Sequence, residues 1–249
     1  KHRVIGGGEP LICVPVVEQD AQSVIREITY LSQSTADMIE WRVDAFRDFT
    51  DYNAIRSVFE AVAPLLGEKL FLYTFRTAHQ GGMAQVKAEQ LDDLHDLAAE
   101  SGCVDLVDLE FFEEDRPLHK IKRLREMGVS VIASHHDFEQ TPSPEVMKML
   151  LEKMCAGGAD IVKLAVMPQN YKDVLNLLDV TAQFREENPD TPVITMSMGS
   201  LGGISRISGE TFGSCVTFGA HEKPSAPGQF AMKELRQMLD TIHASSQIQ

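Results

Sequence analysis

The stretch Ala159-Asp160-Ile161-Val162-Lys163-Leu164-Ala165-Val166 decides the fold, because it is a short apolar run of the kind that forms a buried strand. A longer segment, 171–186, follows it with apolar residues at helical spacing. The same alternation recurs along the chain and predicts eight strand–helix units. The expected strands are residues 11–17, 38–43, 70–76, 104–110, 129–135, 160–166, 192–198 and 214–218. The expected helices are residues 21–31, 52–63, 84–101, 118–127, 144–156, 171–186, 201–211 and 230–244.

Eight such units predict an α/β fold, a (β/α)8 TIM barrel, with a doubly wound open sheet as the alternative. No low-complexity linker or shift in composition divides the chain, so we expect residues 1–249 to form a single domain. Residues 1–10 contain three consecutive glycines and precede the first strand. We expect them to form an extra turn or short hairpin at the barrel floor.

Composition narrows the classes of function. The formal net charge is −14, which argues against nucleic acid or an anionic membrane as partner, because either requires a basic face. No apolar run approaches the roughly 20 residues of a membrane span, and no secretory leader precedes the first strand. The four cysteines lack C-x-x-C spacing and read as reduced packing residues. We therefore expect a cytoplasmic protein.

Lys163 is unusual because it interrupts an apolar strand. Burial removes water from an ammonium group, which favours the neutral amine and makes it usable as a nucleophile toward a carbonyl. The alternative is a lysine near the strand end whose amine reaches solvent.

Ionisable residues lie two apart on one face of an expected strand. Glu40, Arg42 and Asp44 share a face because side chains alternate along a strand. A solvated polar face would explain one such strand. Polar or charged residues, however, also lie in or directly after four further expected strands, at Arg76, Asp108, Glu110, Ser134, His135, His136 and Lys163. Since residues at the carboxyl ends of barrel strands converge, the pattern favours an active site there.

His135 and His136 are adjacent, so in an extended strand they point to opposite sides and cannot both bind one metal ion. We expect no metal. One histidine near a neutral lysine suits proton transfer, because an imidazole is both a capable base and a capable acid at neutral pH.

Two loops remain open to more than one interpretation. The glycines of residues 199–203 could bind phosphate through backbone N–H groups, or could simply form a turn. The Gly/Pro/Ser-rich segment 219–228 follows the last strand and could be a lid or a plain surface connection.

Taken together, the motifs resemble those of the type I 3-dehydroquinate dehydratases. The resemblance is carried in order by Glu40–Asp44, Thr74–Arg76 with Gly81 and Gly82, Ser134–Phe138, Ile161–Ala165, Met196–Gly199 with Ser205 and Arg206, and Ser225–Gln229. It spans nearly the whole chain. It implies a (β/α) barrel that commonly dimerises, needs no metal or organic cofactor, and converts 3-dehydroquinate to 3-dehydroshikimate in the shikimate pathway.

The resemblance also implies roles for individual residues. Lys163 would form a Schiff base with the substrate ketone, and His136 would take and return the proton. Arg206, aided by Ser225 and Gln229, would hold the carboxylate, since a guanidinium matches a carboxylate bidentately. The remaining expected substrate contacts are the polar residues Glu40, Arg42 and Arg76 and the apolar wall residues Met196, Met198, Phe138 and Phe218.

Gln80 departs from the family pattern, which has a glutamate here as the partner of the catalytic histidine. A neutral amide can orient an imidazole but cannot stabilise an imidazolium by charge. We therefore expect His136 to titrate lower than it would beside a glutamate, with slower proton transfer.

Two other functions remain open. A Schiff-base aldolase on the same barrel would also use a strand lysine and would favour phosphate at residues 199–203. A non-catalytic binding protein for small acids would bind ligand without turnover.

Overall fold

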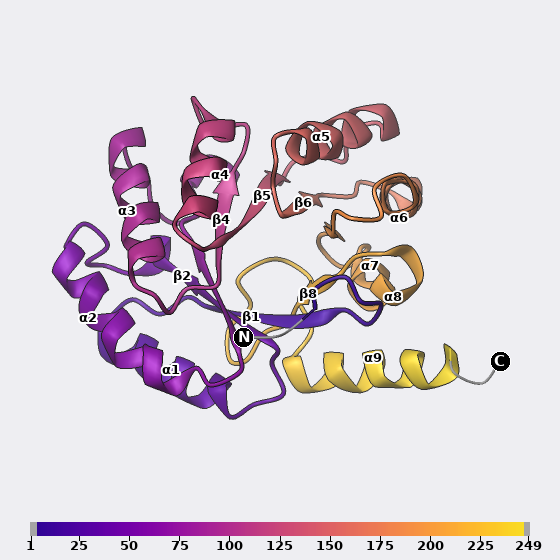
Figure 1. Cartoon of the computed structure of the whole chain (residues 1–249). Helices are drawn as coiled ribbons and strands as arrows, with labels where there is room; N and C mark the ends of the chain where they lie inside the picture. Colours follow the sequence, from indigo (N-terminus) through magenta and orange to yellow (C-terminus); the bar gives the residue numbers. More distant parts are fainter. Residues whose placement is uncertain (1–3, 247–249) are drawn as a thin grey trace.

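Eight parallel strands surround the centre of the computed structural model, which describes residues 4–246 (Figure 1). In chain order they are β1 (Leu11–Val16), β2 (Met38–Arg42), β3 (Leu70–Thr74), β4 (Leu106–Glu110), β5 (Ser130–Asp137), β6 (Ile161–Val166), β7 (Val193–Ser197) and β8 (Val216–Phe218). Their order in the sheet is β7-β6-β5-β4-β3-β2-β1-β8. Every strand expected from the sequence is present, and the (β/α)8 TIM barrel is confirmed rather than the open sheet.

The barrel closes where β8 meets β7. β8 pairs with β1 from Leu11↔Val216 to Cys13↔Phe218. Toward β7, the described residues show a single bridge, Val193↔Ser214, with Cys215 N–H donating to Val193 O at 2.8 Å. The closure between β7 and β8 is therefore the least extensively paired part of the wall.

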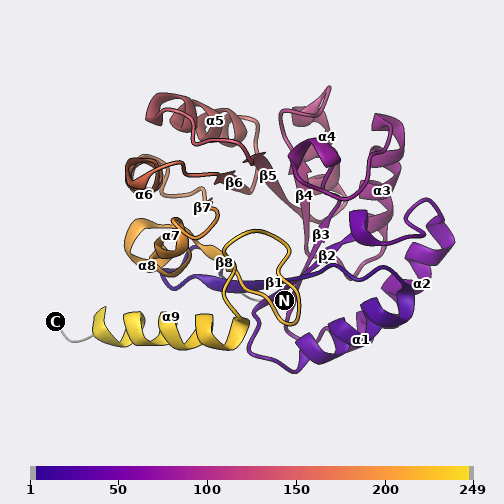
Figure 2. The ribbon, with the colours of Figure 1, turned by 180° about the vertical axis from the view of Figure 1, so that it is seen from behind.

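Helices alternate with the strands and cover the outside of the barrel (Figures 1 and 2). They are α1 (Ala21–Ser32), α2 (Tyr52–Val62), α3 (Ala88–Glu100), α4 (Pro117–Glu126), α5 (Pro144–Ala156), α6 (Tyr171–Glu187), α7 (Gly203–Ile207), α8 (Gly209–Phe212) and α9 (Met232–Ser246). Three 3₁₀ turns join them, η1 (Val43–Ala45), η2 (Ala63–Leu65) and η3 (Ala78–Gln80). Helix starts follow local chemistry: the Ser143 hydroxyl accepts from Val146 N–H just before Pro144.

Two expected helices differ from the structure. The helix expected at 84–101 begins only at Ala88, because Ala84 is held by Ala78, whose N–H donates to Ala84 O at 3.0 Å. The helix expected at 201–211 is divided at Ser208, whose hydroxyl donates back to Ile204 O at 2.8 Å. A hydroxyl that bonds its own preceding turn competes with the continuing helix.

The inner faces of the strands change character along their length. On β2, β4, β5 and β6 an apolar residue packs inside the barrel below the site, namely Met38, Leu106, Ile132 and Ile161. Two positions later the same faces carry Glu40, Asp108, Ser134 and Lys163, all buried. Apolar side chains thus fill the barrel interior toward the amino ends of the strands, while polar groups meet at the carboxyl ends.

The segment before β1 forms a turn at the barrel floor. Residues 5–9 are turn and bend, and the partly buried Ile5 packs against the inner apolar cluster. The Gly6 carbonyl accepts a hydrogen bond from Arg185 at 3.3 Å. The expected turn is therefore present over the described part of residues 1–10; residues 1–3 lie outside it.

None of the helices formed by residues 4–246 has the length and apolar character that crossing a membrane requires.

Candidate active site

A cavity at the carboxyl ends of the strands contains nearly all the site residues expected from the sequence. Of those residues, only Arg206 is not among the lining side chains. The residues that line it are Glu40, Arg42, Arg76, Gln80, His136, Phe138, Lys163, Met196, Met198, Phe218, Ser225 and Gln229, together with Gly81, Ala165 and Ala226. The sequence pattern of alternating polar residues therefore converges on one place in the fold.

Lys163 lines this cavity and is buried, with 3% of its surface exposed. Its Nζ donates to Asp108 Oδ2 at 3.1 Å and lies 4.5 Å from the centre of the Phe218 ring. The amine therefore sits between an anion and an aromatic face. The alternative of a lysine that reaches solvent is excluded by this burial.

Asp108 joins the lysine to a second cation. Arg76 Nη2 lies 2.9 Å from Asp108 Oδ2, and the Ser134 hydroxyl donates to Asp108 Oδ1 at 2.6 Å. Burial works to raise the pKa of Asp108, but Arg76 first and then Lys163 hold that pKa far below its usual value. Asp108 is thus a carboxylate at neutral pH.

The sequence predicts a neutral Lys163 amine because burial removes water from it. The structure adds the Asp108 carboxylate, whose charge stabilises an ammonium, while burial favours the free amine. The same anion would stabilise any cation formed at Lys163 Nζ, including an iminium.

His136 is held by Gln80. Gln80 Oε1 accepts from the His136 backbone N–H at 2.9 Å and lies 3.0 Å from His136 Nδ1. Because that oxygen can only accept, Nδ1 carries the hydrogen and Nε2 keeps its lone pair. Burial, followed by the charges of Arg76 and Lys163, lowers the pKa of His136 well below its ordinary value. The ring is therefore neutral and able to act as a base.

His135 points to the other side of β5, as expected for adjacent strand residues. Its ring packs edge-on against Phe112, with centroids 5.4 Å apart, and burial lowers its pKa. Across residues 4–246, no three His, Cys, Asp or Glu side chains are placed to hold a metal ion.

Glu40 and Arg42 are fixed by neighbours in the barrel. The Thr74 hydroxyl donates to Glu40 Oε1 at 2.7 Å, and Arg42 forms two 2.8 Å hydrogen bonds with Asp44. Asp44 also accepts the backbone N–H groups of Arg76 at 3.2 Å and Met83 at 3.0 Å. Asp44 therefore ties β2 to the segment that carries Gln80.

Gly82 is required in that segment. A Cβ atom there would lie 1.8 Å from the Arg76 carbonyl oxygen. The loop can close over the site only because residue 82 has no side chain.

Arg206 lies on α7 beside the cavity and is 2% exposed. Its Nη2 donates to Pro227 O at 2.9 Å, while Nε and Nη1 are buried without a partner among the described residues. Burial lowers its pKa to about 10, so the group stays charged at neutral pH. A buried guanidinium with unused donors is suited to a carboxylate.

The loop after β8 brings Ser225 and Gln229 to the cavity. Gln229 Oε1 accepts from Ser225 N–H at 2.8 Å, and its Nε2 donates to the Ser225 hydroxyl at 3.0 Å. Pro227 O accepts from Gly199 N–H at 3.2 Å. The loop thus lies over the site, as a lid would, and it uses the Gly199 N–H. The Gly199 N–H is therefore not free for a phosphate, and the Gly202 backbone packs against Ser197 O. Both contacts favour a simple turn at residues 199–203 over a phosphate site.

Sequence reasoning left three residues of this network without a role. Asp108, Glu110 and Ser134 connect Arg76, Lys163 and the segment before Gln80, and Glu110 accepts from Arg76 at 2.9 Å and from Thr77 N–H at 2.9 Å. The available signal was their position on the inner face of β4 and β5.

Comparison with known proteins gives one consistent result. The family model for type I 3-dehydroquinase matches residues 12–246. A 3-dehydroquinate dehydratase of Syntrophotalea carbinolica is 42% identical over 241 residues, covering 96% of this chain and 95% of the relative. The crystal structure of a type I 3-dehydroquinate dehydratase from Clostridium difficile, described with covalent modified comenic acid, superposes with a TM-score of 0.94 at 39% identity, covering 98% and 96% of the two chains. The 3-dehydroquinate dehydratase of Geobacillus kaustophilus superposes with the same TM-score at 36% identity, covering 98% and 95%.

Proposed function

The chain belongs to the type I 3-dehydroquinase family and is a hydro-lyase of the shikimate pathway, and we propose that it dehydrates 3-dehydroquinate through a Schiff base on Lys163. The single observation that carries the proposal is a buried lysine amine that shares a cavity with a neutral, oriented histidine.

In the first step the free amine of Lys163 attacks the substrate ketone. The carbinolamine that forms takes up one proton from solvent and loses water, which gives an iminium, and hydrolysis in the last step releases that proton again. The iminium is cationic, and the Asp108 carboxylate at 3.1 Å from Nζ stabilises it. An iminium withdraws electrons more strongly than a ketone, so the adjacent carbon becomes acidic.

His136 then acts as base and acid. Its Nε2 takes the proton from the adjacent carbon, and the C–H electrons form an enamine. The enamine expels the neighbouring hydroxyl group, which leaves as water with the proton that His136 returns. Water finally hydrolyses the iminium, so that 3-dehydroshikimate leaves and the lysine amine is restored. Gln80 keeps Nδ1 protonated and so keeps Nε2 available.

Arg206 supplies the carboxylate contact in this proposal. Its two unpartnered nitrogens are buried, and Ser225 and Gln229 line the cavity from the loop whose Pro227 carbonyl accepts from Arg206. Binding the carboxylate there fixes the ring so that its ketone faces Lys163 and its acidic carbon faces His136. Glu40, Arg42 and Arg76 provide the polar wall, and Met196, Met198, Phe138 and Phe218 the apolar wall.

The test is reductive trapping. Incubation with 3-dehydroquinate and sodium borohydride should add one substrate-derived mass to the protein, and peptide mapping should place it on Lys163. The Lys163→Ala variant should gain none. Lys153, an exposed lysine in the last turn of α5, provides the matched control: Lys153→Ala should trap normally.

The same experiment separates the alternatives. A binding protein that forms only hydrogen bonds would give no adduct with the unchanged protein. An aldolase would give adducts with phosphorylated aldehydes and would cleave a carbon–carbon bond. Either result would overturn the proposed function.

We further propose that residues 1–249 act as one catalytic domain within a cytoplasmic homodimer that needs no cofactor. The family resemblance supports the dimer and the absence of a cofactor, and the cysteine spacing supports a reducing compartment. Exposed apolar residues on the neighbouring helices α5 and α6 also support a covered face, namely Val146, Met149, Tyr171 and Leu175. Sedimentation at several protein concentrations tests the dimer.

A further inference from the structure

The loop between β8 and α9, residues 219–231, carries two side chains of the active site. Figure 2 shows it crossing the middle of the barrel between β8 and α9. Its ends are joined by a bridge between Ala220 and Ala231. Between these ends lie Ser225 and Gln229, which line the active-site cavity. The path of the loop therefore decides where these two side chains lie.

The two arms of this loop are held by different contacts. On the arm that leads to α9, Pro227 O accepts from Gly199 N–H at 3.2 Å and from Arg206 Nη2 at 2.9 Å. On the arm that comes from β8, residues 221–224 form no backbone hydrogen bond within the described part of the chain. The position of that arm therefore depends on its side chains.

His221 holds the arm from β8 against α1. Its Nδ1 lies 2.7 Å from Glu27 Oε1, and its ring stacks on Tyr30 with the ring centroids 4.0 Å apart and 16° between the planes. Glu27 and Tyr30 lie three residues apart on α1, so they share one face of the helix. Because a carboxylate oxygen can only accept, Nδ1 donates, and the two contacts fix both the edge and the plane of the ring. The side chains of His221 and Glu27 are only 22% and 18% exposed, so water screens their contact only in part.

A second contact on the same arm is weaker. Lys223 Nζ lies 3.4 Å from Glu18 Oε1, and the lysine side chain is 65% exposed. An exposed ion pair of this kind contributes little to stability, because water screens it and the long side chain loses freedom. His221 is therefore the main anchor of the arm.

The chain between His221 and Ser225 is short and stiff. Only residues 222–224 lie between them, and Pro224 has a fixed φ angle. Ser225 in turn is bound to Gln229, whose Oε1 accepts from the Ser225 N–H at 2.8 Å and whose Nε2 donates to the Ser225 hydroxyl at 3.0 Å. The position of the His221 ring therefore limits where both side chains can lie.

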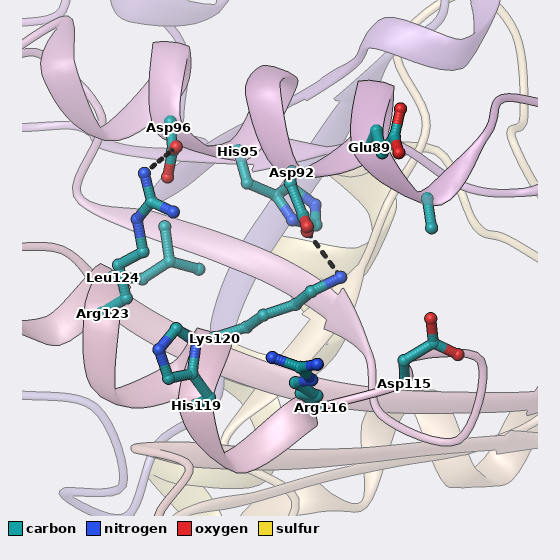
Figure 3. Close-up of a pocket in the computed structure, with 11 residues that line it drawn as sticks. Glu89, Asp92, His95, Asp96, Asp115, Arg116, His119, Lys120, Arg123 and Leu124 are labelled. Carbon is teal, nitrogen blue, oxygen red and sulfur yellow. Dashed lines mark hydrogen bonds and ion pairs between the residues drawn. The ribbon is translucent and has the colours of Figure 1, made fainter.

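Ion pairs elsewhere on the outside of the barrel make no such connection. Between α3 and α4, Lys120 pairs with Asp92 at 2.5 Å and Arg123 pairs with Asp96 (Figure 3). None of these four residues lines the active-site cavity. Their contacts join one helix to the next, whereas the His221 contact joins a helix to the loop that reaches the active site. The α3–α4 pairs therefore provide a matched control.

We propose that His221 is a positioning residue for substrate binding. Fixed by Glu27 and Tyr30, it holds the loop where Ser225 and Gln229 contact the substrate carboxylate. This role rests on the proposed function, because it takes the carboxylate of 3-dehydroquinate as the ligand of the loop. A change that weakens only the binding of substrate raises KM and leaves kcat nearly unchanged.

Steady-state kinetics with 3-dehydroquinate test this role. His221→Ala should raise KM at least about fivefold, because hydrogen bonds to a charged group are weakened, while kcat changes less than about twofold. Conservative variants should preserve binding: Glu27→Gln keeps an acceptor and Tyr30→Phe keeps the ring, so each should raise KM less than the alanine variant at the same position. The double variant His221→Ala, Glu27→Ala should raise KM little more than His221→Ala alone, since both changes break one contact.

Two variants serve as controls. Lys223→Gln and Arg123→Gln each remove an exposed partner of an ion pair and should change KM less than about twofold. Melting temperatures of all variants separate a loss of folding from a loss of binding, and His221→Ala should have a Tm close to that of Arg123→Gln. Borohydride trapping at saturating 3-dehydroquinate should still modify Lys163 fully in His221→Ala.

The outcomes distinguish the role of His221 from the proposed function. If the unchanged protein forms product, the role of His221 is overturned by an unchanged KM in His221→Ala, by an equal rise in KM in Lys223→Gln, or by a fall in kcat without a rise in KM. Each of these results leaves the proposed function intact. Failure of the unchanged protein to form adduct or product would overturn both.

Discussion

Replacing Gln80 by glutamate should raise the pKa of His136 and move the acidic limb of the pH–rate profile upward. Gln80 Oε1 lies 3.0 Å from His136 Nδ1, so Gln80→Glu would place a carboxylate at hydrogen-bond distance from the ring. An imidazolium beside that carboxylate is stabilised, whereas beside the neutral amide it is not. His136 is useful as a base only when neutral, and its pKa is now well below the ordinary value.

The size of the shift depends on Glu113. An opposite charge this close changes a pKa by about 1–3 units, which corresponds to about 1.4–4 kcal/mol. The other arm of Gln80, Nε2, donates to Glu113 Oε1 at 3.3 Å. In the variant this contact would join two carboxylates, which opposes ionisation of residue 80. We therefore expect a shift of about 1 unit in Gln80→Glu and up to about 3 units in the Gln80→Glu, Glu113→Gln double variant.

The assay is kcat/KM for formation of 3-dehydroshikimate, measured between pH 5 and 9 for both variants and for Glu113→Gln alone as control. The acidic limb should move upward in Gln80→Glu and further upward in the double variant. The plateau rate should also rise, because a more basic imidazole removes the proton more readily. NMR titration of the His136 ring gives the same pKa independently. An acidic limb that stays in place in both Gln80 variants would refute the reasoning.

Three further results are expected. Arg206→Gln should raise KM more than it lowers kcat, by about 10–100-fold, since charged hydrogen bonds of about 1.5–3 kcal/mol are lost; an unchanged KM in steady-state kinetics contradicts the clamp. The pKa of His95 falls from 6.5 to about 4 on folding, so the unfolded chain gains its proton first and stability is lost as pH falls from 6.5 toward 4, by up to about 3 kcal/mol. Urea unfolding of His95→Leu should show a shallower loss over that range, and equal slopes would oppose the assignment. Gly82→Ala should lower stability by about 1–3 kcal/mol and reduce activity, because the new Cβ would lie 1.8 Å from Arg76 O; calorimetry that finds no change in Tm would show that the loop can yield.

The fold could be predicted because two periodicities alternate so regularly. Runs such as residues 160–166 alternate with segments such as 171–186, and the strand ends were placed within a few residues. The starts of helices that follow loops near the site are harder to predict from the sequence. The late start of α3 at Ala88 depends on Ala78 pairing with Ala84, a contact that no local pattern announces.

The sequence indicates which residues gather in the cavity, but it does not indicate which of them bond to one another. Inner-face alternation and the family motifs single out Lys163, His136 and Gln80, and in the structure these three residues line one cavity. Asp108 was visible as a polar inner-face residue, yet its bond to Lys163 depends on the register between three strands. A prediction from burial alone therefore misses the Asp108 carboxylate beside the Lys163 amine.

The strands of the barrel wall are paired to different extents. The strands that carry the reacting side chains are paired over many residues, whereas the strand before the loop that covers the site is paired over few. β5 and β6 pair over six register positions and carry His136 and Lys163, so their relative placement resists thermal fluctuation. β8 is three residues long, and the loop that covers the site begins directly after it. Transient opening of backbone hydrogen bonds is therefore cheapest beside that loop. Amides of β8 should exchange with deuterated solvent before those of β5 and β6. Local opening beside the loop can therefore occur while His136 and Lys163 keep their relative positions.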